Sequence, residues 1–165
     1  MIPVKVVVFG KGEAGKSTLI QGLIPDAMNI ERGGRTVAMD YGFVSFEGWT
    51  FHLWGTPGQA RFEPVREVLV QGIDVAVFVI DSSRYFDEED KRLLEEVERQ
   101  GVPYLLFVNH KPDGQKERRS TERLMEGFPK PSRIVEGSAK NPATVSQFVS
   151  ALKEMARSLA PDSSM

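Results

Sequence analysis

The sequence predicts an α/β fold, in which a mostly parallel six-stranded sheet with one antiparallel edge strand lies between two layers of helices. One observation behind this prediction is that short apolar runs rich in Val, Ile and Phe alternate with longer segments of helical period. A second is that no linker, repeat or low-complexity tract interrupts the 165 residues, a length typical of one domain. We therefore expect residues 1–165 to form a single domain.

The expected strands are short and bounded by turn residues, and in chain order they cover residues 3–9, 42–46, 50–54, 73–80, 103–108 and 133–135. The second of them alternates polar and apolar residues, a pattern typical of an edge strand. Only residues 47–49 separate it from the third strand, and so short a connection closes a hairpin. The second strand is therefore expected to run antiparallel to the others.

The expected helices lie between these strands and cover residues 16–24, 60–71, 87–100, 116–126 and 142–159. Their ends carry recognisable signals. Gly101 follows the third helix at the position where a left-handed residue ends many helices, and Asn141-Pro142 places a capping side chain before a proline that starts the last helix.

Composition excludes several kinds of function. The chain has 21 basic and 23 acidic residues, a net charge of −2, so charge alone gives it no grip on nucleic acid or on an acidic membrane. It has no cysteine, which excludes disulfides, thiolate metal sites and a cysteine nucleophile within it. Residue 2 is Ile rather than Gly, so no acceptor for a lipid anchor is expected either. We expect a cytoplasmic protein.

Residues 10–17, Gly-Lys-Gly-Glu-Ala-Gly-Lys-Ser, match the phosphate-binding pattern G-x-x-x-x-G-K-[ST]. The motif follows the first strand and opens a helix, as its mechanism requires: backbone N–H groups surround an anion at the positive end of the helix dipole. Lys16 would reach the β- and γ-phosphates, and Ser17 would offer its hydroxyl to Mg²⁺. The predicted phosphate-binding residues are Gly12, Glu13, Ala14, Gly15, Lys16, Ser17 and Thr18. Together with the strand order, the motif specifies a three-layer P-loop NTPase fold.

Four later segments narrow the class of P-loop protein. These are Thr36 after Gly33-Gly34-Arg35, then Gly-Thr-Pro-Gly-Gln at 55–59, His-Lys-Pro-Asp at 110–113 and Ser-Ala-Lys at 138–140. Their order and spacing resemble the small Ras-like GTPase family over residues 4–159, and in particular prokaryotic members with an altered third motif. The resemblance implies a switch that binds GTP or GDP and hydrolyses GTP slowly with Mg²⁺. It also implies protein effectors and an activating protein as partners.

The resemblance assigns the phosphate end of the site as follows. Thr36 would bind Mg²⁺ with its hydroxyl and, like the Gly58 N–H, would contact the γ-phosphate. Gln59 would orient the attacking water. Catalysis would thus rest on Lys16, Thr36 and Gln59, and the metal ligands would be Ser17 and Thr36.

At the base end of the site, the resemblance assigns guanine recognition to Asp113, whose carboxylate would accept hydrogen bonds from groups that adenine lacks. Lys111 would lie along the base. The segment Ser138, Ala139 and Lys140 would complete the pocket, with the Ala139 N–H donating to the guanine O6.

The sequence departs from the family pattern at two positions. Gly55 replaces an Asp that normally holds a water on Mg²⁺, so weaker metal binding is expected. His110 replaces an Asn that links the base loop to the phosphate loop, and we expect His110 to take over that link, since the neighbouring Asn109 would require a one-residue shift. No arginine that would stabilise the transition state is identifiable; the candidates are Arg32, Arg35, Arg61 and Arg66, each of which is expected on the surface.

Two other functions stay open. One is a nucleotide-dependent interaction module that hardly hydrolyses GTP, because of Gly55 and His110. The other, an ATP-using P-loop protein, is disfavoured because Asp113 suits guanine.

Overall fold

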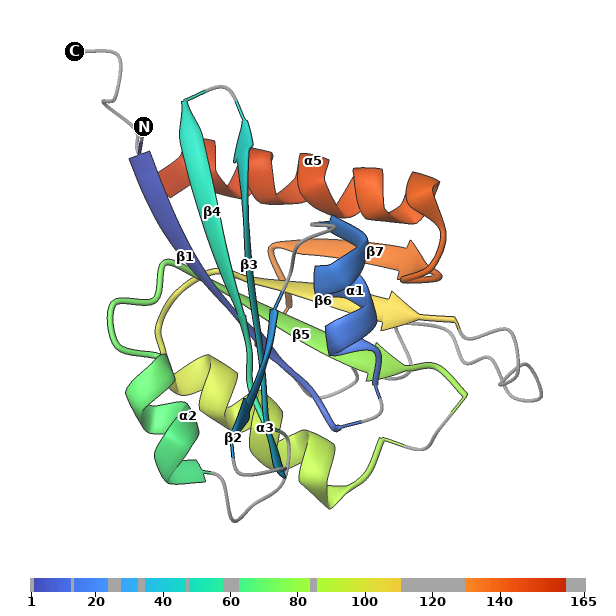
Figure 1. Cartoon of the computed structure of the whole chain (residues 1–165). Helices are drawn as coiled ribbons and strands as arrows, with labels where there is room; N and C mark the ends of the chain where they lie inside the picture. The colour runs from blue at the N-terminus through green and yellow to red at the C-terminus, as the bar shows by residue number, and fades with distance from the viewer. Residues whose placement is uncertain are drawn as a thin grey trace.

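The computed structural model describes residues 2–12, 14–23, 28–32, 35–46, 48–57, 63–83, 86–110 and 130–159, with the backbone alone at 28–32, 35–40 and 46. The elements, in chain order, are β1 (Ile2–Phe9), α1 (Lys16–Leu23), β2 (Met28–Arg32), β3 (Arg35–Phe46), β4 (Trp49–Gly55), α2 (Glu63–Leu69), β5 (Val75–Asp81), α3 (Glu88–Arg99), β6 (Tyr104–Asn109), β7 (Arg133–Gly137) and α5 (Pro142–Leu159). Figure 1 shows their arrangement along the chain.

The strands form one twisted sheet in the order β2-β3-β4-β1-β5-β6-β7. All neighbours pair in parallel except at β3, which runs antiparallel to both β2 and β4. The predicted α/β class and the mostly parallel sheet with one reversed strand are confirmed. Among the described residues, however, the sheet has seven strands rather than six, and β2 rather than the reversed strand lies at its edge.

The difference arises in the segment before residue 42. The sequence predicts a loop around Thr36, whereas β3 begins at Arg35 and pairs with β2 from Arg32↔Arg35 to Met28↔Tyr41. Strand β2 is only five residues long, and its alternation is limited to the apolar residues Met28 and Ile30. This pattern is too short to predict a strand by itself, so the strand depends on hydrogen bonding to β3. The prediction of a loop at Arg35 and Thr36 is therefore wrong.

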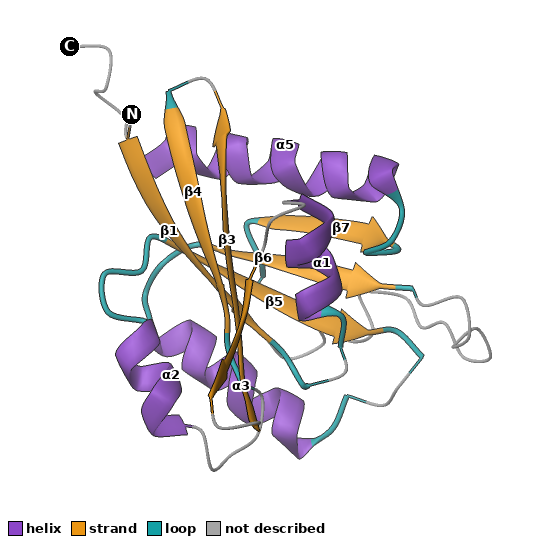
Figure 2. Cartoon of the chain, viewed as in Figure 1, coloured by secondary structure: helices purple, strands orange, loops and turns teal. Residues whose placement is uncertain are grey.

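Helices cover both faces of the sheet, as Figure 2 shows: α1 and α5 lie on one face, and α2 and α3 lie on the other. Alternate residues of β1 serve the two layers. Val6 and Val8 join one apolar core with residues of α1 and α5, while Val7 and Phe9 join a second core with residues of α3. The central strands β5 and β6 are buried almost throughout, which explains their continuous apolar sequences.

The helix boundaries follow the sequence signals closely. Asp87 caps α3 through a reciprocal capping box with Asp90, and α5 covers the predicted residues 142–159. Helix α1 is described over Lys16–Leu23, and residue 24 of the predicted helix lies outside the described residues. Helix α2 ends at Leu69, two residues before the predicted end, and residues 60–62 of that prediction also lie outside the described residues. The helix predicted over 116–126 lies outside the described residues. Within the described part of the chain, no helix is both long and apolar enough to cross a membrane.

Candidate functional site

The loop between β1 and α1 holds a buried lysine at the start of a helix. Lys16 is only 6% exposed. Its Nζ donates to the carbonyl oxygens of Gly10 and Lys11, the latter at 2.8 Å, so the ammonium lies over the loop instead of extending into solvent. The loop is closed further by a bond from the Ala14 N–H to the Lys11 carbonyl, 3.0 Å long. The arrangement presents a cation and the amino-terminal end of α1 at one place, as an anion site requires.

Two glycines allow this loop to pass close to other elements. Gly10 has φ +152°, and a Cβ there would lie 2.6 Å from the Val79 carbonyl oxygen on β5. Gly15 has φ +114°, and a Cβ there would collide with the Asn109 side-chain amide. Both positions exclude other residues for steric as well as conformational reasons. The loop therefore packs closely against β5 at Gly10 and against β6 at Gly15. This close packing of the backbone supports a phosphate-binding loop whose donors are backbone N–H groups.

Asn109, the last residue of β6, links two segments that are distant in the sequence. It is 3% exposed. Its Nδ2 donates to the Ala14 carbonyl at 2.9 Å, and its Oδ1 accepts from the Ala139 N–H at 3.0 Å. One side-chain amide therefore satisfies a buried acceptor in the phosphate loop and a buried donor in the turn after β7.

This geometry corrects the assignment of His110. The predicted link between the base loop and the phosphate loop is made by Asn109, whereas His110 Nδ1 pairs with the hydroxyl of Ser82 at 2.7 Å. The physical reason is register: β6 ends at Asn109, so its side chain enters the interior beside the phosphate loop, while His110 follows the strand. A polar residue closing a fully apolar run was the available signal. Lys111 and Asp113 lie outside the described residues.

The Ser-Ala-Lys segment forms a tight turn after β7. Ala139 is buried and Lys140 is exposed, and the Lys140 N–H donates to the Ser138 hydroxyl at 3.2 Å. The Ala139 N–H, predicted to donate to guanine, instead donates to Asn109. Its contribution to a base pocket is thus to hold the turn in place. The turn lies at the same carboxyl edge of the sheet as the phosphate loop, where open α/β folds bind ligands.

Lys11 fastens the phosphate loop to the start of α3. Its Nζ lies 2.8 Å from Asp87 Oδ2 and 3.0 Å from Asp90 Oδ2. The hydrogen bond from Lys11 lowers the pKa of Asp87 to about 2. Burial raises the pKa of Asp90, and Lys11 opposes that shift without cancelling it. Burial alone would lower the pKa of Lys11, but its hydrogen bonds with Asp87 and Asp90 outweigh burial and raise it.

This tether makes a pH-dependent contribution to stability. Because the pKa of Asp87 is lowered in the folded protein, its ion pair stabilises the fold above the ordinary Asp range near 4 and is lost as the pH falls toward about 2. Asp87→Asn keeps a good helix cap but removes the ion pair. We expect this substitution to lower the free energy of unfolding, measured with denaturant, more near pH 6 than near pH 3. In a Lys11→Met background this pH dependence should become smaller without disappearing, because the Asp90 N–H still donates to the Asp87 carboxylate. An undiminished pH dependence would mean that Lys11 is not the main cause of the lowered pKa.

The segment after β4 is anchored on both sides. Thr56 is fully buried, and both its N–H and its hydroxyl donate to the Val8 carbonyl, at 3.0 and 2.9 Å. The Pro57 carbonyl accepts from Arg66 of α2 at 2.8 Å. Of the four arginine candidates, Arg66 is thus buried rather than on the surface as predicted; the side chains of the other three, and residues Gly58 and Gln59, lie outside the described part of the structure.

The residues predicted to bind a divalent cation are placed only in part. Ser17 is the second residue of α1 and is exposed, so its hydroxyl, a hard oxygen ligand, stands at the phosphate loop. Thr36 lies in β3 opposite Glu31. Gly55 ends β4 and supplies no carboxylate, and no cluster of three or more His, Asp or Glu ligands occurs among the described residues. Ser17 and phosphate oxygens are the kind of ligands that Mg²⁺ takes while keeping several waters.

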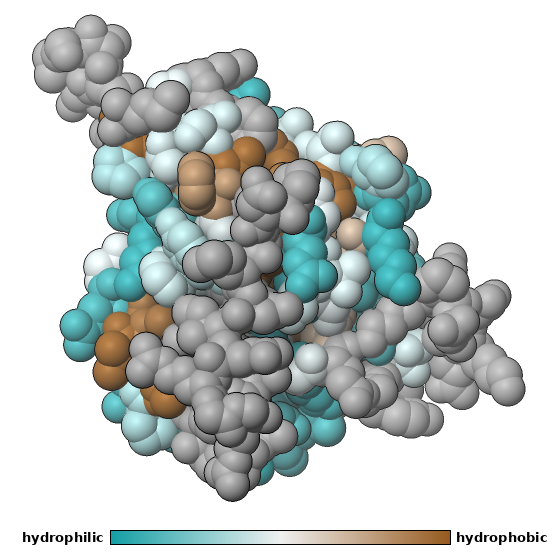
Figure 3. All heavy atoms as spheres, viewed as in Figure 1, coloured by the Kyte–Doolittle hydropathy of each residue, from teal (hydrophilic) through white to brown (hydrophobic). Residues whose placement is uncertain are grey.

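Apolar side chains are also exposed on α2 and β3. Figure 3 shows exposed apolar side chains over α2, where Val68 is 66% exposed. Phe43 on β3 is 54% exposed as well. On the same strand, the Tyr41 ring lies against that of Trp54, with centroids 4.3 Å apart and the planes tilted by 41°.

Comparison with known proteins identifies the family. A family model described as 50S ribosome-binding GTPase matches residues 5–110, which include the phosphate loop, the Gly-Thr-Pro-Gly-Gln segment and Asn109. The chain belongs to this GTPase family. The GTPase is 40% identical over 106 residues to an uncharacterised protein of Methanocaldococcus jannaschii, a match covering 64% of the chain and 69% of that protein.

Other relatives are longer. The GTPase is 30% identical over 123 residues to GTPase Der of Bradyrhizobium sp., which covers 65% of the chain but only 26% of Der. Among solved structures it resembles the G domain of the T. maritima FeoB iron transporter, with a TM-score of 0.69, 22% identity, and 93% and 99% of the two chains covered. It also resembles bacterial selenocysteine-specific elongation factor EF-Sec, with a TM-score of 0.77 and 16% identity over 96% of this chain and 29% of that one. These structural likenesses concern the fold.

Proposed function

We propose that this GTPase is a small Ras-like molecular switch that hydrolyses GTP to GDP slowly with Mg²⁺ and signals its nucleotide state to protein partners. The observation that carries the proposal is the Asn109 bridge, which ties the phosphate loop to the Ser138-Ala139 turn. A site that joins phosphate-binding and base-binding segments through one buried side chain suits a nucleotide, whereas an isolated phosphate loop would suit any phosphate ester.

The phosphate end would be bound by the loop of residues 10–17. Lys16 is already confined there by two carbonyl groups, so little conformational entropy is lost when a phosphate oxygen replaces one of them. Mg²⁺, when bound with Ser17 and Thr36 as its protein ligands, would neutralise phosphate charge. The missing carboxylate at Gly55 supports weaker metal binding than an acidic residue would give.

Guanine would be selected by Asp113 and Lys111, with Ser138, Ala139 and Lys140 closing the pocket. Only the last three are described, and their turn is held by Asn109. The near-neutral net charge of −2 supports proteins rather than nucleic acid as partners, and the exposed apolar residue Val68 on α2 gives an effector or activating protein an apolar surface to contact. A cytoplasmic location accords with the absence of cysteine from these 165 residues.

An interaction module with little hydrolysis is the second candidate, favoured by Gly55. Phosphate release separates the two. For the switch we expect slow GTP turnover that falls at least about tenfold in Gln59→Leu with GTP affinity unchanged, since Gln59 would orient the water and not bind nucleotide. Gln71→Leu, the same change at an exposed position after α2, should leave turnover intact. Turnover at the background level in the unmodified protein would favour the interaction module.

Nucleotide choice is tested by competition. Excess GTP or GDP should displace a fluorescent guanine nucleotide, and excess ATP should not. The reason is that adenine lacks the N–H groups from which the Asp113 carboxylate would accept hydrogen bonds. Equal displacement by ATP would contradict guanine selection and favour the ATP-using class.

A further inference from the structure

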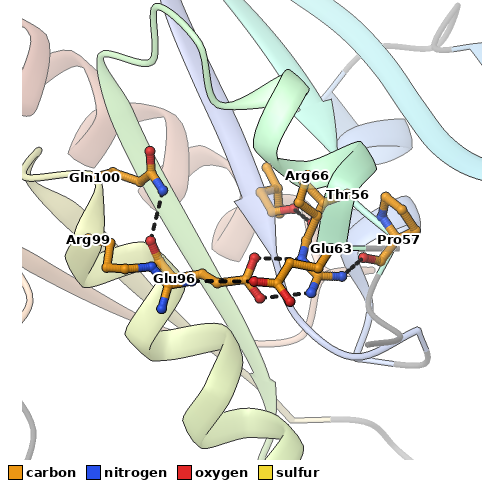
Figure 4. A network of polar contacts seen from close by, with 8 residues as sticks. Thr56, Pro57, Glu63, Arg66, Glu96, Arg99 and Gln100 are labelled. Carbon is orange, nitrogen blue, oxygen red and sulfur yellow. Dashed lines mark hydrogen bonds and ion pairs between the residues drawn. The ribbon is translucent and has the colours of Figure 1, made fainter. Parts of the chain in front are cut away.

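A buried arginine on α2 pairs with a buried glutamate on α3. Arg66 is 3% exposed and Glu96 is 6% exposed. Arg66 Nε donates to Glu96 Oε1 and Nη2 donates to Oε2, each at 2.7 Å, so the pair is bidentate, as Figure 4 shows. Burying such a pair brings a desolvation cost that cancels much of its attraction, and pairs of this kind are weak evidence for a contribution to stability alone. The pair is therefore better explained by a group that it holds in position than by stability.

A further hydrogen bond of Arg66 indicates what is positioned. Its Nη1 donates to the Pro57 carbonyl at 2.8 Å. The Pro57 C=O and the Gly58 N–H belong to one planar peptide unit, so an interaction that fixes the direction of this carbonyl also fixes the direction of the next N–H. Under the proposed function, that N–H is the group that contacts the γ-phosphate.

The preceding residue is fixed as well. Thr56 holds the Val8 carbonyl of β1 through two hydrogen bonds and is fully buried. The Pro57 peptide is thus held from β1 on one side and, through Arg66, from α3 on the other. Glu96 keeps the guanidinium in the plane that reaches Pro57, because its two carboxylate oxygens occupy two of the donors in the fixed fork.

We infer that Arg66 is a positioning residue that, locked by Glu96, aims the Pro57-Gly58 peptide at the γ-phosphate and so couples α3 to the presence of GTP. The inference rests on the proposed function, since it needs a nucleotide with a γ-phosphate. It also assigns Arg66 a task other than that of a transition-state arginine, because its guanidinium is engaged with Glu96 and Pro57. By reciprocity, a partner that disturbs the pair from the cleft between α2 and α3 would weaken GTP binding relative to GDP.

The test compares affinities for GDP and for a non-hydrolysable GTP analogue by fluorescence titration. In Arg66→Lys the charge remains, but one ammonium cannot reproduce the fork to Glu96 and Pro57 together. We expect analogue affinity to fall about tenfold, the equivalent of one hydrogen bond to a charged group, with GDP affinity changed less than about twofold. Arg133→Lys is the matched control, because Arg133 pairs with Glu154 at 2.9 Å on the exposed surface. In this variant the ratio of analogue affinity to GDP affinity should be unchanged.

Equal losses of affinity for GDP and for the analogue would overturn the inference, because they would mean a merely structural role. Unchanged affinity for both nucleotides would overturn it as well. Glu96→Gln, which keeps the shape and removes the charge, should change the ratio in the same direction. If neither variant folds, side-chain NMR of the unmodified protein decides: the Arg66 Nε–H should be protected from exchange in the analogue complex, and solvent-like exchange would refute the inference. Failure of the unmodified protein to bind either nucleotide would refute the proposed function instead.

Discussion

Lys16→Ala is expected to reduce GTP and GDP affinity by at least about 100-fold, because it removes a buried ammonium that would make charge-assisted bonds of about 1.5–3 kcal/mol each with two phosphate groups. Lys16 is 6% exposed and already held within the phosphate loop by the Gly10 and Lys11 carbonyls. No other described side chain donates to both of those carbonyls. Titration with a fluorescent guanine nucleotide measures the loss.

The same substitution distinguishes loss of binding from loss of folding. The substitution removes the donor to the Gly10 and Lys11 carbonyls, but it also removes a buried charge and introduces the best helix former at the first residue of α1. These effects oppose one another, so the stability of the nucleotide-free protein should change less than its nucleotide affinity. Lys91→Ala is the control, since Lys91 lies on the surface of α3, 46% exposed and paired with Glu88. Unchanged affinity in Lys16→Ala would mean that phosphate binds elsewhere.

Asn109→Ala is expected to cost about 2–6 kcal/mol of folding stability, because it leaves two buried backbone groups without their partners at about 1–3 kcal/mol each. The two groups are the Ala14 carbonyl and the Ala139 N–H, both in residues that are at most 3% exposed. For a chain of this size the melting temperature should fall on the order of 10 °C, measured by differential scanning calorimetry without nucleotide. Nucleotide affinity should fall as well, because the phosphate loop and the Ser138-Ala139 turn would no longer be held together.

His110→Ala is the matched comparison for this prediction. The His110 side chain pairs with the Ser82 hydroxyl and, among the described residues, links neither the phosphate loop nor the Ser138-Ala139 turn. Its replacement should lower the melting temperature by a few degrees at most, the equivalent of about 1 kcal/mol. A larger effect from His110→Ala than from Asn109→Ala would restore His110 as the linking residue.

Much of the fold was accessible from local pattern. The continuous apolar sequences of β5 and β6 mark strands buried on both faces, and the capping residue Asn141 marks the start of α5. These signals depend only on neighbouring residues. Strand β2 carries only a short signal, the alternation of Met28 and Ile30 with polar residues. Its pairing with β3 completes the strand and also converts the expected loop at Thr36 into strand.

The site divides in the same way. The phosphate loop could be predicted because all the residues that would bind phosphate there lie next to one another in the sequence, within residues 10–17. The linking residue could not be predicted, because the choice between Asn109 and His110 depends on which of the two is the last residue of β6. The side chain of that residue points toward the phosphate loop. A shift of one residue along a strand reverses the side that a side chain faces, and a single sequence does not state where the strand ends.

By itself, therefore, the sequence determined the α/β architecture, the phosphate loop with its buried lysine, and the order of the segments that follow the parallel strands. The tertiary structure alone decided that Asn109 reaches Ala14, 95 residues away, that Arg66 is buried against Glu96, and that Lys11 is tethered to Asp87 and Asp90. The physical reason is that strand and helix signals arise from periodicity over a few residues, whereas these contacts depend on the register and twist with which distant segments meet at one edge of the sheet.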